Sequence, residues 1–310
     1  MIRKHNRRAA KAAFAISFGV AIVIGLAAAV AAGAAQRHAT AGSTILLGSK
    51  NFPEEDILGQ LYKQALQAKG FSVSYKSQIG STELMQTALT SGKINMYPEY
   101  TGVIVLDLAH KAAPKTAAAT VVAARKFEQS RGFTVLNPTP FFDADTVSVL
   151  KSTAQKYGLK TIPDLKKFKG TFRFAGYPEC DKRITCLLGL KQIYGLKNLG
   201  FVQIGTIPVT TLLDQHKADG GDIFSTQPEL ASGKYTVLTD TKHIFGFQNV
   251  VPVVSKKLVT QLGSKFTSTL NAVSAKLTIP AMIAMNKAVA IDKKTPASVA
   301  TAFLKANGLL

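Results

Sequence analysis

The feature that most constrains the fold is a regular alternation of short apolar runs with longer amphipathic segments, which begins near residue 44. Residues 44–48 form an apolar run typical of a buried strand, and residues 53–69 open with proline and acids and carry one apolar face, as a helix does. Residues 71–75 alternate like a strand, and residues 82–89 can form a second helix. This order predicts an α/β fold with helices on the faces of a parallel sheet.

The alternation continues to the C-terminus. A chain of this length can form one large domain or two smaller lobes. Further strands are predicted at residues 146–150, 170–175, 222–224 and 236–238, the third of them after a glycine turn that contains Gly221. Helices are predicted at residues 186–194, 264–275, 280–289 and 296–306, with a helix start at residues 162–165.

The N-terminal residues 1–35 have the pattern of an export signal. Residues 1–11 carry five basic side chains and no acid, residues 12–35 are apolar, and residues 32–34 have the small-residue pattern that signal peptidase accepts. The apolar run is also long enough to span a bilayer, so the segment is either a cleaved signal or a retained N-terminal anchor. No cysteine lies near Ala34, which excludes a lipoprotein anchor. We expect a polar linker at residues 36–43 and a protein at the extracytoplasmic face of the cell membrane.

The chain is strongly basic, but its charge does not have the pattern of a nucleic-acid surface. Without the basic residues of segment 1–11, the chain retains 33 Lys and Arg against 18 Asp and Glu, a formal charge of +15. This charge is spread evenly and is not interleaved with aromatic residues. We expect it to hold an exported protein near anionic lipid or wall polymer, and we expect no nucleic-acid partner.

Two cysteines, Cys180 and Cys186, are the only ones in the chain. In an exported protein, two cysteines this close are most simply a disulfide that closes a short loop. A metal site is the competing interpretation, but it would need His or further Cys nearby, and the sequence has none there. We therefore expect a disulfide and no metal.

Sequence motifs of known catalytic sites are absent. The chain has no nucleophile elbow, zinc-protease helix, phosphate-binding Walker loop or dinucleotide-binding glycine motif. Its five histidines are scattered, and none is paired in sequence with a candidate nucleophile. These observations argue against an enzyme and imply no cofactor, although catalytic groups can also assemble in space.

Several segments point to function instead, and together they resemble the substrate-binding proteins of osmoprotectant ABC importers for glycine betaine, choline and related solutes. The most specific are GSKNF at residues 48–52, YPEYTG at residues 97–102 and NVVPVV at residues 249–254. The resemblance runs in order from about residue 44 to the C-terminus. The loop with Cys180, Arg183 and Cys186 is similar to an actinobacterial branch of this family.

The resemblance implies a two-lobed periplasmic-binding-protein fold of type II, with a ligand cleft between two α/β lobes. The chain would cross between lobes near Asp145 and again near Gln248. Residues 44–145 plus 249–310 would form lobe 1, and residues 146–248 would form lobe 2.

The resemblance also implies site residues. Family pockets hold a quaternary ammonium among aromatic faces by cation–π attraction, and meet a ligand carboxylate with Lys or Arg. By position, Tyr100 and Phe224 would be aromatic walls, and Lys50 and Arg183 would be donors to the anion.

Three positions depart from the family pattern. Asp145 and Gln248 stand where aromatic walls are expected, and Val103 follows the YPEYTG segment in place of threonine. Burying an unpaired carboxylate is costly. We therefore expect Asp145 to face a ligand hydroxyl or ammonium proton, or else Lys50 or Arg183 across the cleft, and we expect weak binding of glycine betaine.

Each candidate also has a plain interpretation. Lys50 can be a solvated loop lysine, Tyr100 can pack a corner between strand and helix, and Phe224 can be ordinary core. Arg183 can pair with Glu179 or Asp181 and merely order its loop.

These patterns predict a monomeric receptor that captures a small compatible solute for an ABC importer. Its partners would be a membrane permease and a cytoplasmic ATPase. The alternatives are a membrane-tethered sensor or scavenger with the same fold, and a secreted enzyme.

Overall fold

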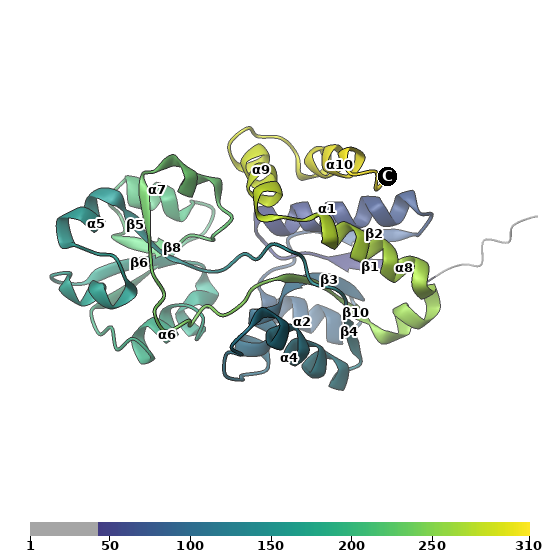
Figure 1. Ribbon diagram of the computed structural model, residues 1–310, viewed down its shortest axis with the longest axis horizontal. Coiled ribbons are helices and arrows are strands. Elements are labelled where there is room, and N and C mark those ends of the chain that lie inside the picture. The colour runs from purple at the N-terminus through teal and green to yellow at the C-terminus, as the bar shows by residue number, and fades with distance from the viewer. Residues whose placement is uncertain (1–42) are drawn as a thin grey trace, which may run out of the picture. The chain divides into compact units, whose positions relative to one another are not determined.

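The computed structural model describes residues 43–310, which belong to one compact unit built on two five-stranded sheets (Figure 1). The export signal or anchor expected in residues 1–35 lies outside the described residues, as does the expected linker except for its last residue. No helix within residues 43–310 has the length and apolar character needed to cross a membrane.

The first sheet has the strand order β2-β1-β3-β10-β4. Its strands are β1 (Ile45–Gly48), β2 (Val73–Lys76), β3 (Met96–Tyr100), β4 (Phe133–Val135) and β10 (Val250–Ser255). Strand β1 is parallel to β2 and β3, as the sequence predicts, but β10 is antiparallel to both β3 and β4. Strand β10, which was not predicted, is antiparallel because the chain returns from the second sheet and enters the first one beside the end of β3.

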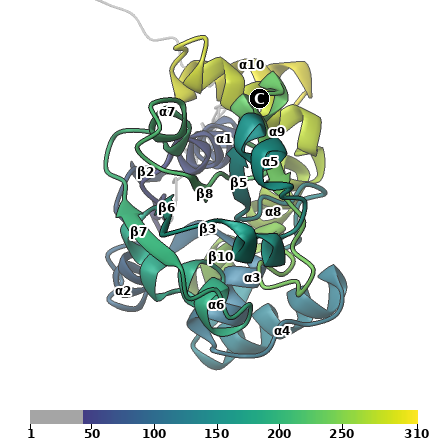
Figure 2. The same cartoon turned by 90° about the vertical axis from the view of Figure 1, so that its left-hand side faces the viewer.

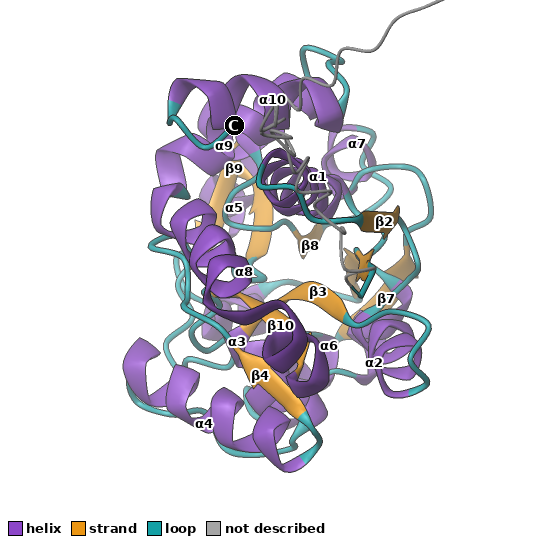
Figure 3. Ribbon diagram, turned by 90° about the vertical axis from the view of Figure 1, so that its right-hand side faces the viewer, coloured by secondary structure: helices purple, strands orange, loops and turns teal. Residues whose placement is uncertain are grey.

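Helices cover both faces of the first sheet (Figure 3). They are α1 (Pro53–Ala68), α8 (Lys256–Lys276), α9 (Ile279–Ala290) and α10 (Pro296–Ala306) on one face, and α2 (Thr82–Thr90) and α4 (Ala117–Ser130) on the other. Strand β10 is buried on both sides, since Val250 packs into the core under α1 and Val251 into the core under α2 and α4. A continuous apolar strand such as this one requires helices on both faces.

The second sheet has the order β7-β6-β8-β5-β9, and Figure 2 shows it from its outer side. Its strands are β5 (Val147–Leu150), β6 (Phe172–Gly176), β7 (Leu199–Gln203), β8 (Gly220–Asp222) and β9 (Tyr235–Leu238). Its helices are α5 (Lys151–Tyr157), α6 (Leu187–Gln192) and α7 (Val209–Asp214), with 3₁₀ turns η2 (Ile162–Lys167), η3 (Pro178–Lys182) and η4 (Pro228–Ser232).

Strand β8 begins two residues earlier than the sequence predicts. The predicted glycine turn is part of the strand, because a side chain at Gly221 would approach Val209 to 2.5 Å and the carbonyl oxygen of Ala175 to 2.7 Å. Phe224, predicted to lie in the strand, instead follows it in a loop.

Two segments connect the sheets. The chain leaves the first sheet after Val135 and enters the second at Val147, and it returns between Leu238 and Val250. The two segments are hydrogen-bonded to each other, since the Asp143 amide donates to the Gln248 carbonyl at 3.2 Å. This double crossing places residues of both segments beside the ends of both sheets.

Candidate functional site

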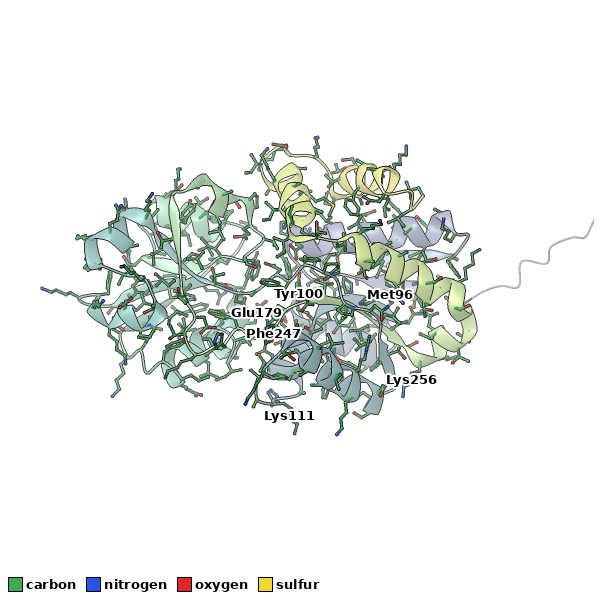
Figure 4. The ribbon with its side chains drawn as sticks, in the orientation of Figure 1. Met96, Tyr100, Lys111, Glu179, Phe247 and Lys256 are labelled. Atoms are coloured by element: carbon green, nitrogen blue, oxygen red, sulfur yellow. A yellow bond between two sulfur atoms is a disulfide. The ribbon has the colours of Figure 1, made fainter. Side chains whose placement is uncertain are left out.

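One cavity collects side chains from both sheets and from the crossing segments. All six residues singled out in the sequence line it, namely Lys50, Tyr100, Asp145, Arg183, Phe224 and Gln248. Figure 4 places Tyr100 and Glu179, another lining residue, in the region where the two sheets face each other. Their shared location is a property of the fold, whereas their roles in binding stay predictions.

Four aromatic rings in this cavity form a continuous row. Phe52 lies 6.2 Å from Tyr100 and 5.4 Å from Phe224, measured between ring centroids. Phe224 in turn stacks on Tyr177 at 6.0 Å, with the two ring planes 8° apart. The sequence missed Phe52 and Tyr177, although Phe52 ends the GSKNF segment and Tyr177 opens the loop that leads to Cys180.

The fold brings the rings together because each stands at or just after the carboxyl end of a strand. Phe52 follows β1, Tyr100 ends β3, Tyr177 follows β6 and Phe224 follows β8. In α/β sheets the loops at this edge form the ligand site. The two sheets present these edges to the same cavity.

Tyr100 is anchored at its hydroxyl by Glu54, the second residue of α1. The hydroxyl donates to Glu54 Oε1 at 2.9 Å, and Glu54 Oε2 accepts from Thr226 Oγ1 at 2.5 Å and Asn286 Nδ2 at 2.8 Å. Burial raises the pKa of Glu54, while the hydrogen bonds from Thr226, Asn286 and Tyr100 oppose that rise. Because Thr226 follows β8, Glu54 joins elements of the two sheets.

Lys50 is neither a solvated lysine nor a partner of Asp145. Its ammonium lies 2.6 Å from Glu99 Oε1 and 4.3 Å from the centroid of the Tyr100 ring. The side chains of Lys50 and Glu99 are almost entirely buried. Lys50 therefore pairs with Glu99, which is 49 positions away in the sequence, rather than with Asp145. Its role as a donor to a ligand anion stays a prediction.

Arg183 lies in the loop closed by the Cys180–Cys186 disulfide, which the structure contains. Its guanidinium donates to Glu83 on α2, from Nη2 at 3.1 and 3.2 Å and from Nε at 3.3 Å. Burial raises the pKa of Glu83, but the charge of Arg183 together with hydrogen bonds from Ser81, the backbone and Arg183 outweighs this and holds the pKa below its usual value. Arg183 therefore bonds to an element of the first sheet rather than to Glu179 or Asp181 of its own loop.

Three aspartates converge on the cavity. Asp143 Oδ1 accepts from the Thr226 amide at 3.0 Å and Ser225 Oγ at 3.1 Å, Asp222 Oδ1 accepts from the Thr146 amide at 3.3 Å, and Asp145 lines the cavity with them. Burial raises the pKa of all three carboxyls. The charge of Asp145 adds to the rise for Asp143 and Asp222, whereas the charges of Arg183 and Lys50 oppose it for Asp145. Of the alternatives expected for Asp145, the ion pair with Lys50 or Arg183 is not formed, because these cations pair with Glu99 and Glu83; contact of Asp145 with a donor group of the ligand stays a prediction.

Gln248 is fully buried and uses its amide to fix the crossing segment. Its Oε1 accepts from the Val103 amide at 3.1 Å, and its Nε2 donates to the Phe245 carbonyl at 2.8 Å. A side chain at Gly102 would come within 2.6 Å of this amide, so the glycine of the YPEYTG segment makes room for it. Gln248 thus holds the turn after Tyr100 against the returning segment.

The site combines aromatic faces with carboxylates, an arrangement suited to binding a cation rather than to acid–base chemistry on a substrate. Within residues 43–310, no group of three His, Cys, Asp or Glu side chains is placed to hold a metal ion.

Comparison with known proteins gives consistent results. Residues 43–306 match the family described as the substrate-binding domain of ABC-type glycine betaine transport systems. A glycine-betaine-binding protein of Pseudomonas aeruginosa is 30% identical over 291 residues, covering 90% of this chain and 91% of the relative. The glycine betaine-binding protein YehZ of Escherichia coli is 27% identical over 282 residues, with 86% and 92% covered. Among solved structures, a glycine betaine/carnitine/choline ABC transporter protein superposes with a TM-score of 0.68 at 23% identity, covering 86% of this chain and 99% of that one.

Proposed function

Because this chain belongs to the family of substrate-binding domains of ABC-type glycine betaine transport systems, we propose that it captures a small ammonium-containing solute in the cavity between its two sheets. The family comprises solute receptors, not enzymes, that work with the permease and ATPase of an importer. We assign the same role to this chain, without a catalytic step.

The row of four rings is the observation that carries this proposal. Phe52, Tyr100, Tyr177 and Phe224 face one cavity that also holds carboxyl groups. An alkylated ammonium has no or few N–H donors, so it gains most from ring faces and from nearby negative charge. An apolar solute would leave the carboxyls unpaired, which is costly.

The six residues predicted from the sequence then divide into two groups. Tyr100, Phe224 and Asp145 are the direct ligand contacts in this proposal. Lys50, Arg183 and Gln248 are positioning residues, because their polar atoms already bond to Glu99, Glu83 and backbone groups.

The remaining parts of the proposal follow the family. The receptor is extracytoplasmic and monomeric, delivers its solute to a membrane permease, and depends on a cytoplasmic ATPase for import. Lobe 1 comprises residues 44–145 and 249–310, and lobe 2 comprises residues 146–248; the positions of the two chain crossings support these boundaries.

Titration calorimetry of the full-length protein with choline, carnitine and glycine betaine tests the proposal. At least one of these compounds should bind, and Tyr177→Ala should weaken that binding several-fold, since a cation–π contact contributes about 0.5–2 kcal/mol. Tyr235→Ala removes a tyrosine of β9 that is outside the cavity, and it should leave affinity unchanged. Absence of binding by all three compounds, with the protein folded, would refute the ligand class.

A further inference from the structure

The loop closed by the disulfide contacts the first sheet's helices at two points. Arg183 donates to Glu83 on α2 at 3.1–3.3 Å, and Thr185 Oγ1 donates to the two carboxyl oxygens of Asp107 at 2.9 and 3.2 Å. The loop itself follows β6 of the second sheet, and Asp107 lies in the helical turn after the YPEYTG segment. Because the chain joins the two sheets only through the crossing segments, both contacts break when the sheets move apart.

The loop is fixed to the second sheet. The disulfide between Cys180 and Cys186 closes it, and the Arg183 amide donates to the Cys180 carbonyl at 3.3 Å. The Cys186 amide in turn donates to the Arg183 carbonyl at 3.1 Å. Gly189 on α6 lets the loop pack closely, since a side chain there would come within 1.9 Å of the Ile184 carbonyl oxygen. The loop therefore presents its two polar side chains to the first sheet as one unit.

The cavity has a buried floor and a more exposed rim. Tyr100, Asp222 and Gln248 belong to the floor and are at most 5% exposed. At the rim, the side chain of Arg183 is 17% exposed and that of its partner Glu83 is 54% exposed. Their ion pair thus lies between the two sheets at the boundary with solvent, which we call the mouth of the cavity.

We propose that Glu83, Asp107 and Thr185 are positioning residues that hold Arg183 and its loop across this mouth, and that small molecules enter the cavity when the loop separates from α2. None of these three residues lines the cavity, so they act on access and not on the solute. The inference goes beyond the proposed function, because it concerns the route into the cavity and applies to any small molecule.

The two contacts differ in strength. The Glu83–Arg183 pair is partly exposed, and salt screens such pairs, which stabilise a structure only weakly. Thr185 is fully buried, and a partly buried carboxyl group such as that of Asp107 loses more when its donor is removed. Salt should therefore open the mouth through the ion pair, while the contact of Thr185 limits how often it opens.

The disulfide reports how often the mouth opens, because both cysteines line the cavity and each is only 3% exposed. The probe is tris(hydroxypropyl)phosphine, an uncharged reductant that has to enter the cavity to reach the sulfur atoms. Alkylation and mass spectrometry give the initial rate of reduction in the full-length protein. This rate follows the open fraction when opening and closing are fast compared with reduction.

We expect Glu83→Gln to accelerate reduction about two- to five-fold, which is the effect of losing one exposed ion pair. Thr185→Val keeps the shape of the side chain and removes its hydroxyl, and it should accelerate reduction roughly ten-fold. Asp214→Asn is the matched control, because it removes an exposed ion pair with Lys234 that lies outside the cavity. This control should be reduced at the native rate.

Salt separates the ion pair from a purely structural effect. Raising the ionic strength from about 0.01 M to about 1 M shortens the Debye length from about 30 Å to about 3 Å. The native protein should then be reduced as fast as Glu83→Gln, whereas the rate for Glu83→Gln should not change.

Three results would overturn the inference. The first is a native rate in both Glu83→Gln and Thr185→Val, with urea unfolding showing that both variants are folded. The second is an equal acceleration in Asp214→Asn, which would indicate general loosening of the protein. The third is an equal effect of salt on the native protein and on Glu83→Gln. The test needs no bound solute, so failure of choline, carnitine and glycine betaine to bind would refute the proposed function and leave this inference standing.

Discussion

The side chain of Tyr100 contacts an aromatic ring, a buried lysine and a buried glutamate at the same time. Its ring packs 6.2 Å from Phe52, its face lies under the ammonium of Lys50, and its hydroxyl bonds to Glu54. Only 4% of the residue is exposed. Any contact of Tyr100 with a ligand is therefore coupled to a buried network of charged groups.

We expect Tyr100→Ala to weaken choline binding more than Phe224→Ala does. The Phe224 variant loses ring contacts with Phe52 and Tyr177, whereas the Tyr100 variant also removes the ring beneath the Lys50 ammonium and the donor to Glu54 Oε1. The penalty for an unsatisfied buried group is about 1–3 kcal/mol, which corresponds to roughly 5–150-fold in affinity. Calorimetry on both variants decides the order, and Tyr100→Phe serves as a milder control. Equal affinities for the two alanine variants would contradict this ranking.

Glu55 gives a prediction for stability against pH. Burial raises its pKa from 4.5 to about 8, and its Oε1 has no hydrogen-bond partner. Between these values the folded state holds a proton that the unfolded state has lost, so the contribution of this group to stability decreases as pH rises, by up to about 1.4 kcal/mol per pH unit. Urea unfolding at pH 5 and pH 8 should show a smaller decrease for Glu55→Gln than for the native protein. The control Glu229→Gln should behave like the native protein, and equal decreases in all three would disprove the assignment.

At the level of elements, the disulfide loop connects the two sheets. The loop spans Cys180 to Cys186, carries Arg183, and bonds through it to Glu83 on α2. Thr185 of the same loop donates at 2.9 Å to Oδ2 of Asp107, which lies on the π-helical turn η1 (Ile104–Leu108). The loop therefore contacts the first sheet's helices at two points.

Replacing both cysteines by serine should reduce the free energy of unfolding by about 2 kcal/mol, the chain-entropy value for so short a loop. Choline binding should weaken as well, because both cysteines line the cavity and the loop presents Arg183. Urea unfolding and calorimetry measure the two effects. Reductant should lower the stability and the choline affinity of the native protein in the same way, and it should change nothing in the double variant. If neither the double variant nor the reduced native protein loses stability, the loop does not need the crosslink.

The sequence was sufficient for most elements and for the fold, because amphipathic helices such as α1 and α10 and apolar strands such as β1 have strong local patterns. It did not predict strand β10, whose direction depends on the path of the chain between the sheets. It also placed β8 too late, since the glycines that permit close packing there are typical of turns as well.

Sequence reasoning found six lining residues but missed the partners of the charged ones. Glu99 is 49 positions from Lys50, and Glu83 is 100 positions from Arg183. Such pairings are formed by tertiary structure and leave no local signal. Phe52 and Tyr177 were within reach, because both belong to segments that the sequence already marked.

At the scale of the whole described region, a buried hydrogen-bond network joins the two sheets beside the cavity. Glu54 on α1 accepts from Thr226, which follows β8, and from Asn286 on α9, whose amide also lies 3.2 Å from Thr226 Oγ1. These groups are at most 6% exposed. The network therefore contributes to the arrangement in which both sheets contact one ligand.

Thr226→Val retains the shape of the side chain and removes the hydroxyl that reaches Glu54. We expect choline affinity to decrease about ten-fold, because a buried carboxyl oxygen loses one of its donors at the junction of the two sheets. Thr241→Val changes an exposed threonine and should have no effect. Calorimetry that finds both variants equal to the native protein would show that this network does not support binding.

The most direct test of the central claim is a crystal structure of the protein with choline. We predict that the trimethylammonium group lies within about 6 Å of the ring centroids of Phe52, Tyr100, Tyr177 and Phe224. The hydroxyl should contact Asp145 or Asp222. Choline bound outside this cavity, or bound in it away from the four rings, would show that the rings do not form the binding site.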